Sequence, residues 1–170
     1  MTPSAPIRAA VLTVSDRCSR GERADTSGPA LCDLLRSRLS AEIIHTAILP
    51  DEPDQLEAYF RAWSEPALPA VRTDLILSTG GTGLAPRDIT PEAAAKVIQR
   101  PHPALMELAR FRCLTKTPKT YLSRGVAGTI NQTLLITLPG SPRGATEMLE
   151  ALLDILPHAI ETLRGDVKDG

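Results

Sequence analysis

Four short apolar stretches stand out along the chain of 170 residues, and polar residues or glycines end each of them. The third, "DLILSTGG", shows no alternation of apolar and polar positions, which is typical of a parallel strand covered on both faces. A short apolar run that ends at turn residues is the pattern of a buried strand. We therefore predict β-strands over residues 7–15, 41–49, 74–81 and 133–139.

Apolar residues recur at helical spacing between and after these stretches. Leu31, Leu34, Leu35 and Leu39 give the clearest example, because this spacing places them on one face of a helix. Pro157 should kink or split the last helix, since proline removes a hydrogen bond from a helix interior. Helices are predicted over 29–40, 54–64, a short segment beyond Pro91, 102–114 and 141–165; residues 65–71 are expected to form a loop, and the turn-rich segment 117–132 receives no assignment.

The alternation of strands with helices predicts one domain, residues 1–170, built as an α/β sandwich on a largely parallel sheet. A chain of this length buries ~70% of the surface that its unfolded form exposes, so it needs no disulfide or metal to hold a core. The sequence contains no internal repeat and no low-complexity tract.

Polar residues mark the starts of two predicted helices. Thr26 or Ser27 is expected to cap the helix over 29–40. Thr90 is expected to cap the helix beyond Pro91, with the proline at the first helical position and Glu92 facing the positive end of the helix dipole. Because these structural roles explain "TPEA" completely, its residues are left out of the predicted chemistry.

Composition and charge change the picture by excluding partners. A net charge of −1 gives no electrostatic reason to expect nucleic acid or an anionic membrane, and 3% aromatic residues argue against a base-stacking surface. Three cysteines and three histidines are scattered without a CxxC pair, so neither a zinc site nor a thiol site is predicted. Nothing approaches a membrane span, and we expect a cytoplasmic protein.

Three unusual turns follow predicted strands: "VSDR" at 14–17, "STGGTG" at 78–83 and "LPGSPRG" at 138–144. Ligands of parallel α/β sheets bind outside the carboxyl ends of the strands, so these turns are expected to meet at one site. In the third turn, Ser141 is expected to cap a helix and Pro142 to begin it. Arg143 then opposes the helix dipole by ~0.3–1 kcal/mol, which indicates either an anion nearby or an exposed arginine.

The glycine-rich turn has the features of an anion cradle. Gly80, Gly81 and Gly83 permit positive φ and let a ligand approach the backbone, and Thr82 adds a hydroxyl donor. No lysine follows as in a Walker loop, and Pro86 stands where a dinucleotide motif needs its third glycine. A tight turn alone needs one glycine, so we favour a ligand cradle.

The charged pair after this turn allows two interpretations. Arg87 could clamp a phosphate while Asp88 holds a divalent cation. Alternatively, the two residues form a surface salt bridge that contributes ~0–1 kcal/mol. The residues alone leave both interpretations open.

Five ordered motifs carry a resemblance to a known family: "TVSDRCSRGERADTSGP", "LPDE", "STGGTGLAPRDITPEA", "LSRGVAG" and "LITLPGSP". Over roughly residues 8–163 the chain resembles the molybdenum cofactor biosynthesis family MogA/MoaB, which includes molybdopterin adenylyltransferase and the G domain of gephyrin. The resemblance implies a three-layer α/β/α sandwich, a homotrimer or hexamer, and binding of molybdopterin and Mg-ATP. The implied reaction transfers AMP to the terminal phosphate of molybdopterin and releases pyrophosphate.

The resemblance also implies roles for individual residues. Asp51 and Asp88 match two carboxylates that are expected to act in catalysis and to hold Mg²⁺. Phosphate or pterin contacts are implied for Ser15, Asp16, Arg17, Thr79, Gly80, Gly81, Thr82, Gly83, Arg87, Ser123, Gly140, Ser141 and Pro142.

A second hypothesis is a protein of the same fold that binds the pterin or serves as a scaffold without catalysis. Retention of both carboxylates favours the enzyme, because a pure binder has no need of them. An enzyme that uses a nucleotide on another substrate is a third hypothesis.

Overall fold

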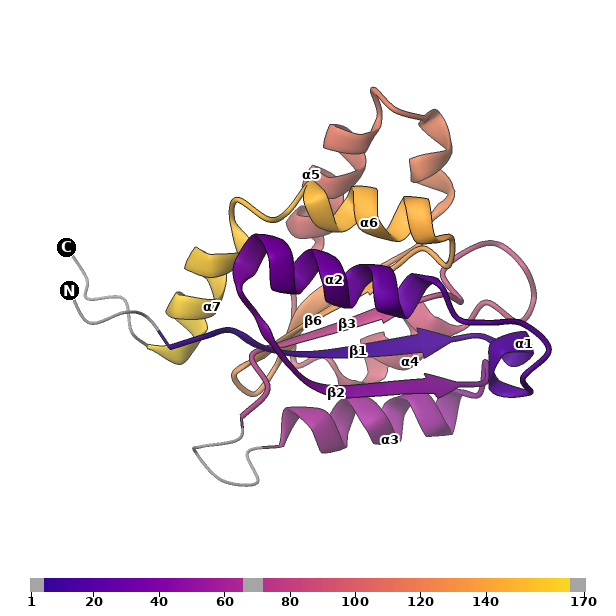
Figure 1. The fold of residues 1–170 in the computed structure, drawn as a ribbon, viewed down its shortest axis with the longest axis horizontal. Coiled ribbons are helices and arrows are strands. Elements are labelled where there is room, and N and C mark those ends of the chain that lie inside the picture. The colour runs from indigo at the N-terminus through magenta and orange to yellow at the C-terminus, as the bar shows by residue number, and fades with distance from the viewer. Residues whose placement is uncertain (1–4, 66–71, 166–170) are drawn as a thin grey trace.

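The computed structural model describes residues 5–65 and 72–165 and shows a six-stranded sheet with helices on both faces (Figure 1). The four predicted strands are parallel neighbours, so their carboxyl ends share one edge of the sheet. The order across the sheet is β2-β1-β3-β6-β5-β4. The strands are β1 Arg8–Val14, β2 Glu42–Leu49, β3 Leu75–Thr79, β4 Arg100–Pro101, β5 Ala127–Ile130 and β6 Thr133–Leu138.

Helices follow most of the strands, as the sequence pattern predicts. The last predicted helix is split into α6 and α7, and Pro157 lies in the first turn of α7. Residues 66–71, which hold most of one predicted loop, lie outside the described residues. The helices are α1 Asp16–Ser19, α2 Ser27–Leu39, α3 Pro53–Ser64, α4 Thr90–Val97, α5 Pro103–Cys113, α6 Pro142–Glu150 and α7 Leu156–Arg164, with a 3₁₀ helix, η2, over Pro118–Leu122.

Successive residues of the central strands enter two separate cores. Val11 of β1 and Leu77 of β3 pack under α2, α5, α6 and α7, whereas Leu12 and Ile76 pack against α3 and α4. Phe60 of α3 is fully buried, and burial of a side chain of this size contributes roughly 1.5–3 kcal/mol. The predicted three-layer α/β/α sandwich is therefore confirmed. In the described ranges no helix is long and apolar enough to cross a membrane.

Two short strands were not predicted. β5 pairs antiparallel with β6, and β4 pairs antiparallel with β5 at the edge of the sheet. β5 follows the turn-rich segment and β4 is two residues long, so neither presents the apolar run that marks a strand in the sequence.

The capping predictions need two corrections. Thr26 is at the N-cap of α2 without a side-chain hydrogen bond; the Asp25 carboxylate accepts instead from the Ser27 and Gly28 N–H groups, at 3.0 and 3.1 Å. Thr90 is the first residue of α4 rather than its cap, and its buried hydroxyl has no hydrogen-bond partner among the described residues. Both carboxylate and hydroxyl are capping groups, so sequence alone could not separate the neighbours.

Candidate functional site

A cavity of about 360 Å³ opens at the carboxyl edge of the parallel strands, at the end of the sheet where β1 and β2 point toward α1 (Figure 1). The three predicted turns meet there, together with the residues that follow β2. Nine of the residues singled out from the sequence line it: Ser15, Asp51, Thr79, Gly80, Gly81, Asp88, Gly140, Ser141 and Pro142.

The glycine loop adopts a backbone that ordinary residues disfavour. Gly80 has φ 106° and Gly81 has φ 63°, and both line the cavity. A Cβ on Gly80 would lie 2.1 Å from the Val14 carbonyl oxygen, and one on Gly81 would lie 2.2 Å from Thr90 Oγ1. Both positions therefore require glycine for conformation and for space.

The turn after β6 packs directly against the glycine loop. Thr79 Oγ1 donates to the Pro139 carbonyl at 2.6 Å, and the Gly80 N–H donates to the Leu138 carbonyl at 3.1 Å. Ser141 caps α6 as predicted, since its Oγ accepts from the Gly144 N–H at 3.1 Å. The two turns thus form one wall of the cavity, held by hydrogen bonds to backbone carbonyls.

Asp51 and Asp88 bring two carboxylates to the same cavity. Asp51 Oδ1 lies 2.9 Å from the position of a Cβ on Gly81, and Asp88 Oδ2 lies 2.8 Å from that on Gly83. Burial raises the pKa of Asp51, and the negative charges of Asp16 and Asp88 add to this rise. Asp51 is therefore a partly buried carboxylate whose negative charge is disfavoured by its surroundings.

The carboxylates of Asp51 and Asp88 suit a Mg²⁺ ion whose remaining ligands come from a substrate. Magnesium is commonly held by one or two carboxylates together with substrate phosphates. The described residues contain no group of three or more His, Cys, Asp or Glu side chains that could hold a metal alone. Asp51 and Asp88 could hold such a cation only together with ligands from outside the protein side chains.

Arg87 does not pair with its neighbour Asp88. Its guanidinium donates to both carboxylate oxygens of Asp16, at 2.7 and 3.0 Å, and to Glu52 Oε1 at 2.9 Å. The hydrogen bond from Arg87 lowers the pKa of Asp16, and the hydrogen bonds to Asp16 and Glu52 raise the pKa of Arg87. The Asp88 carboxylate instead accepts from the Ala85 N–H at 2.9 Å.

The "LSRGVAG" segment, residues 122–128, holds the glycine loop through hydrogen bonds to residues 82 and 83. Ser123 Oγ lies 3.0 Å from Thr82 Oγ1, so these two predicted residues form a hydroxyl pair. Arg124 donates to the Gly83 carbonyl at 2.8 Å and to the Asp88 carbonyl at 2.6 Å, and it pairs with Glu92. The sequence did not predict this role of Arg124, because its acceptors are backbone carbonyls about 40 positions away that no sequence motif identifies.

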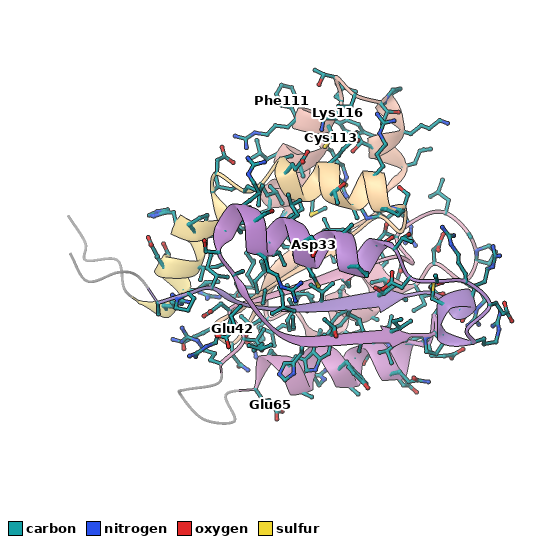
Figure 2. The ribbon with its side chains drawn as sticks, viewed as in Figure 1. Asp33, Glu42, Glu65, Phe111, Cys113 and Lys116 are labelled. Carbon is teal, nitrogen blue, oxygen red and sulfur yellow. The ribbon has the colours of Figure 1, made fainter. Side chains whose placement is uncertain are left out.

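Two predicted arginines lie away from this cavity. Arg17 is an exposed residue of α1 and does not line the cavity. Arg143 lines a second cavity of about 410 Å³ that shares Ser141 with the first, and its Nε donates to Glu147 Oε1 at 2.9 Å. Figure 2 shows Cys113 and Lys116, which also line this second cavity, in the region of α5. An intrahelical ion pair therefore accounts for Arg143 without a bound anion.

The cavity is also lined by residues that were not predicted to contact a ligand: Thr13, Val14, Cys18, Arg23, Ala24, Asp25, Thr26 and Ser27. Among them, Thr13 donates to Asp25 Oδ2 at 2.7 Å and Ser27 to the Gly140 carbonyl at 2.7 Å. Their signal was the "ADTSGP" part of the first motif, which we interpreted as loop and cap.

Comparison with known proteins places this geometry in context. A family profile described as "probable molybdopterin binding domain" matches residues 10–158. A molybdopterin adenylyltransferase of Helicobacter pylori J99 is 38% identical over 161 residues, which cover 94% of this chain and 89% of that protein.

Further similarities extend to a longer protein and to a solved structure. The molybdenum cofactor synthesis protein cinnamon of Drosophila melanogaster is 36% identical, and the match covers 92% of this chain but 26% of that protein. The crystal structure of the molybdopterin biosynthesis enzyme MoaB from Thermus thermophilus superposes with a TM-score of 0.84 at 46% identity. That match covers 94% of this chain and 97% of the other.

Proposed function

The chain belongs to the MogA/MoaB family of molybdopterin-binding proteins, and we propose that it is a molybdopterin adenylyltransferase that uses ATP. It transfers AMP from ATP to the terminal phosphate of molybdopterin and releases pyrophosphate. The observation that carries this proposal is the meeting of the glycine loop (residues 79–83), the Pro-Gly turn after β6 (residues 139–142) and the carboxylates of Asp51 and Asp88 at one cavity.

The residues of the cavity suit this reaction because it requires positioning more than proton transfer. An ionised phosphate oxygen of molybdopterin attacks the α-phosphorus of ATP, and the bond from that phosphorus to the bridging oxygen breaks. The electron pair leaves with pyrophosphate, so no general base is needed. Phosphoryl-type transfer depends mainly on alignment and charge neutralisation.

The glycine loop and the two carboxylates divide this work. We assign the phosphate contacts to backbone N–H groups of the loop beyond Gly80, whose own N–H donates to the Leu138 carbonyl, and Thr82 with Ser123 supports the loop. Asp51 and Asp88 would hold Mg²⁺, which would neutralise phosphate charge. Without that cation, two carboxylates at the cavity would repel phosphate.

Two substrates need more room than one small cavity offers. The cavity of about 360 Å³ and its neighbour of about 410 Å³ share Ser141, so together they form adjoining spaces on either side of the Pro-Gly turn. Volumes of this order are typical of sites for organic ligands. We place the reacting phosphates in the first cavity, where both carboxylates lie.

A non-catalytic binder or scaffold of the same fold is the competing hypothesis. It explains the glycine loop but gives no reason for Asp51 and Asp88, since two carboxylates weaken phosphate binding unless a cation accompanies them.

We further propose that the protein acts in the cytoplasm as a homotrimer or hexamer. Light scattering that gives a monomer mass at micromolar concentration would remove the oligomer from this proposal.

The proposal is tested by incubating the purified protein with molybdopterin and ATP, with and without MgCl₂. We expect adenylylated molybdopterin and pyrophosphate in stoichiometric amounts only when the metal is present. A family member of established activity serves as the positive control. No product under conditions where the control is active leaves the binding hypothesis alone.

A further inference from the structure

Arg87 joins three loops that follow three neighbouring strands. It lies after β3, it binds both carboxylate oxygens of Asp16 after β1, and it reaches the residues after β2. There it donates to the Asp51 carbonyl at 3.1 Å and to Glu52 Oε1 at 2.9 Å. One exposed side chain thus connects the ends of β2, β1 and β3 at the edge of the cavity.

Asp16 and Asp51 hold each other in a reciprocal pair. The Asp16 N–H donates to Asp51 Oδ2 at 3.1 Å, and the Asp51 N–H donates to Asp16 Oδ1 at 3.1 Å. The first bond occupies one oxygen of Asp51 and leaves Oδ1 directed toward the Gly81 backbone. The Asp16 carboxylate thus holds the Asp51 backbone, and the Asp16 N–H holds the Asp51 carboxylate, so a group that fixes Asp16 also restrains Asp51.

We propose that Arg87 is a positioning residue, which orients Asp51 for cation binding through the Asp16 carboxylate and does not itself contact phosphate. This inference rests on the proposed function for the role of Asp51. It differs from a phosphate clamp in the acceptors that the guanidinium uses. The arginine Nε and Nη2 groups already donate to the carboxylates of Asp16 and Glu52 and to the Asp51 backbone carbonyl.

The geometry explains why the residue is arginine. Only a planar guanidinium binds both oxygens of one carboxylate and still reaches another acceptor with the same nitrogen; a lysine ammonium is a point charge without this fork. Groups that orient the ligands of a metal typically change metal affinity or activity by ~10–100-fold when removed. Arg87→Lys is therefore the informative substitution, because it keeps the charge and removes the fork.

The experiment compares wild type with Arg87→Lys. We expect kcat to fall about 10-fold while KM for ATP and for molybdopterin changes less than about twofold. Without substrates, the Kd for Mn²⁺, followed by electron paramagnetic resonance, should rise about 10-fold. Hydrogen exchange of the Asp16 and Asp51 amides should become faster, because their acceptors are no longer held.

Two further variants serve as controls: one makes the same Arg→Lys change away from Asp16, and the other tests whether Arg87 acts through Asp16. Arg20→Lys makes the same change in a bidentate pair with Glu22 that stays within one loop, at 2.6 and 3.0 Å, and should leave every readout unchanged. The double variant Arg87→Lys/Asp16→Asn should lose no more than Asp16→Asn alone, since the two residues act in series.

The outcomes separate the inference from the proposed function. A raised KM with unchanged kcat would show a phosphate clamp, and unchanged amide exchange with unchanged Mn²⁺ affinity would show an ordinary surface pair; either result overturns the inference. Wild-type protein that makes no product would refute the proposed function. The amide exchange and Mn²⁺ measurements would still decide whether Arg87 positions Asp51.

Discussion

The pKa values of Asp51 and Asp74 are shifted in opposite directions, although both residues are aspartates. Asp74 is 3% exposed, yet the hydrogen bonds from Arg164 and the Arg8 N–H outweigh its burial and lower its pKa. Burial raises the pKa of Asp51, and the negative charges of Asp16 and Asp88 add to this rise. The hydrogen bond from the Asp16 N–H is too weak to offset them. The first carboxylate is satisfied within the protein, whereas the second is the one to which we assign a cation.

This difference predicts that Asp51→Asn stabilises the metal-free protein. Because the folded-state pKa of Asp51 lies above its unfolded value, its contribution to stability is full below the unfolded pKa of ~3.9 and is lost as pH rises through the folded pKa. The variant should therefore have a higher Tm than wild type at pH 7, with a gain that shrinks toward pH 4. Thermal unfolding in EDTA measures this, and a lower Tm at pH 7 would contradict it.

The glycine loop owes its path to a close approach between strand ends. Gly80 passes the end of β1 so tightly that a Cβ would meet the Val14 carbonyl oxygen at 2.1 Å. Gly21, in the loop after α1, also has positive φ, at 72°, but has no atom within 4 Å of a built Cβ. The two glycines therefore separate the conformational need for glycine from the spatial one.

We expect Gly80→Ala to lower the free energy of unfolding by several kcal/mol, because backbone must move as well as adopt strain. Gly21→Ala should lose only the conformational part, about 1–2 kcal/mol. Urea unfolding of both variants measures the difference. Equal losses would mean that the loop after β3 is not held close to β1.

The sequence predicted the elements that have long apolar patterns and missed those that depend on neighbours. Buried strands such as β3 and β6 were recognisable from their apolar runs, as was the meeting of three turns at one sheet edge. The antiparallel strand β5 was missed because its pairing with β6 is set by a partner and not by its own pattern. The same limit hid the acceptors of Arg87, which lie 35 and 71 positions away.

Across the molecule, the amino and carboxyl ends of the parallel strands carry different polar networks. The carboxyl edge holds the cavity with Asp51 and Asp88. At the other edge, Asp74 precedes β3 and accepts from Arg164 Nη2 at 2.6 Å and from the Arg8 N–H at 2.8 Å. This network joins β3, the start of β1 and the end of α7, so it serves the sandwich and not the site.

We therefore expect Asp74→Asn to destabilise the fold by about 3–5 kcal/mol without changing the catalytic site, because the substitution breaks the buried ion pair between Asp74 and Arg164. The folded-state pKa of Asp74 is lowered, so its contribution is present above the unfolded pKa and is lost as pH falls through the folded one. Urea unfolding at pH 7 and at pH 3 should show a large difference from wild type that diminishes in acid.

Asp33→Asn provides the matched control, since the exposed pair of Asp33 with Arg36 should contribute ~0–1 kcal/mol. Loss of kcat in folded Asp74→Asn protein would contradict this prediction, because it would show that the two ends of the parallel strands are coupled.

In the proposed reaction, backbone amides of the glycine loop bind the phosphate and the carboxylates bring the metal for AMP transfer. The most direct measurement is a pair on the same preparations of wild type and Asp88→Asn: molybdopterin affinity by fluorescence, and turnover by product formation. We predict an affinity within a few-fold of wild type and a kcat lower by on the order of 10²-fold or more, because the lost charge acts mainly on the transition state. Equal losses in affinity and turnover, or near-normal turnover, would contradict the claim.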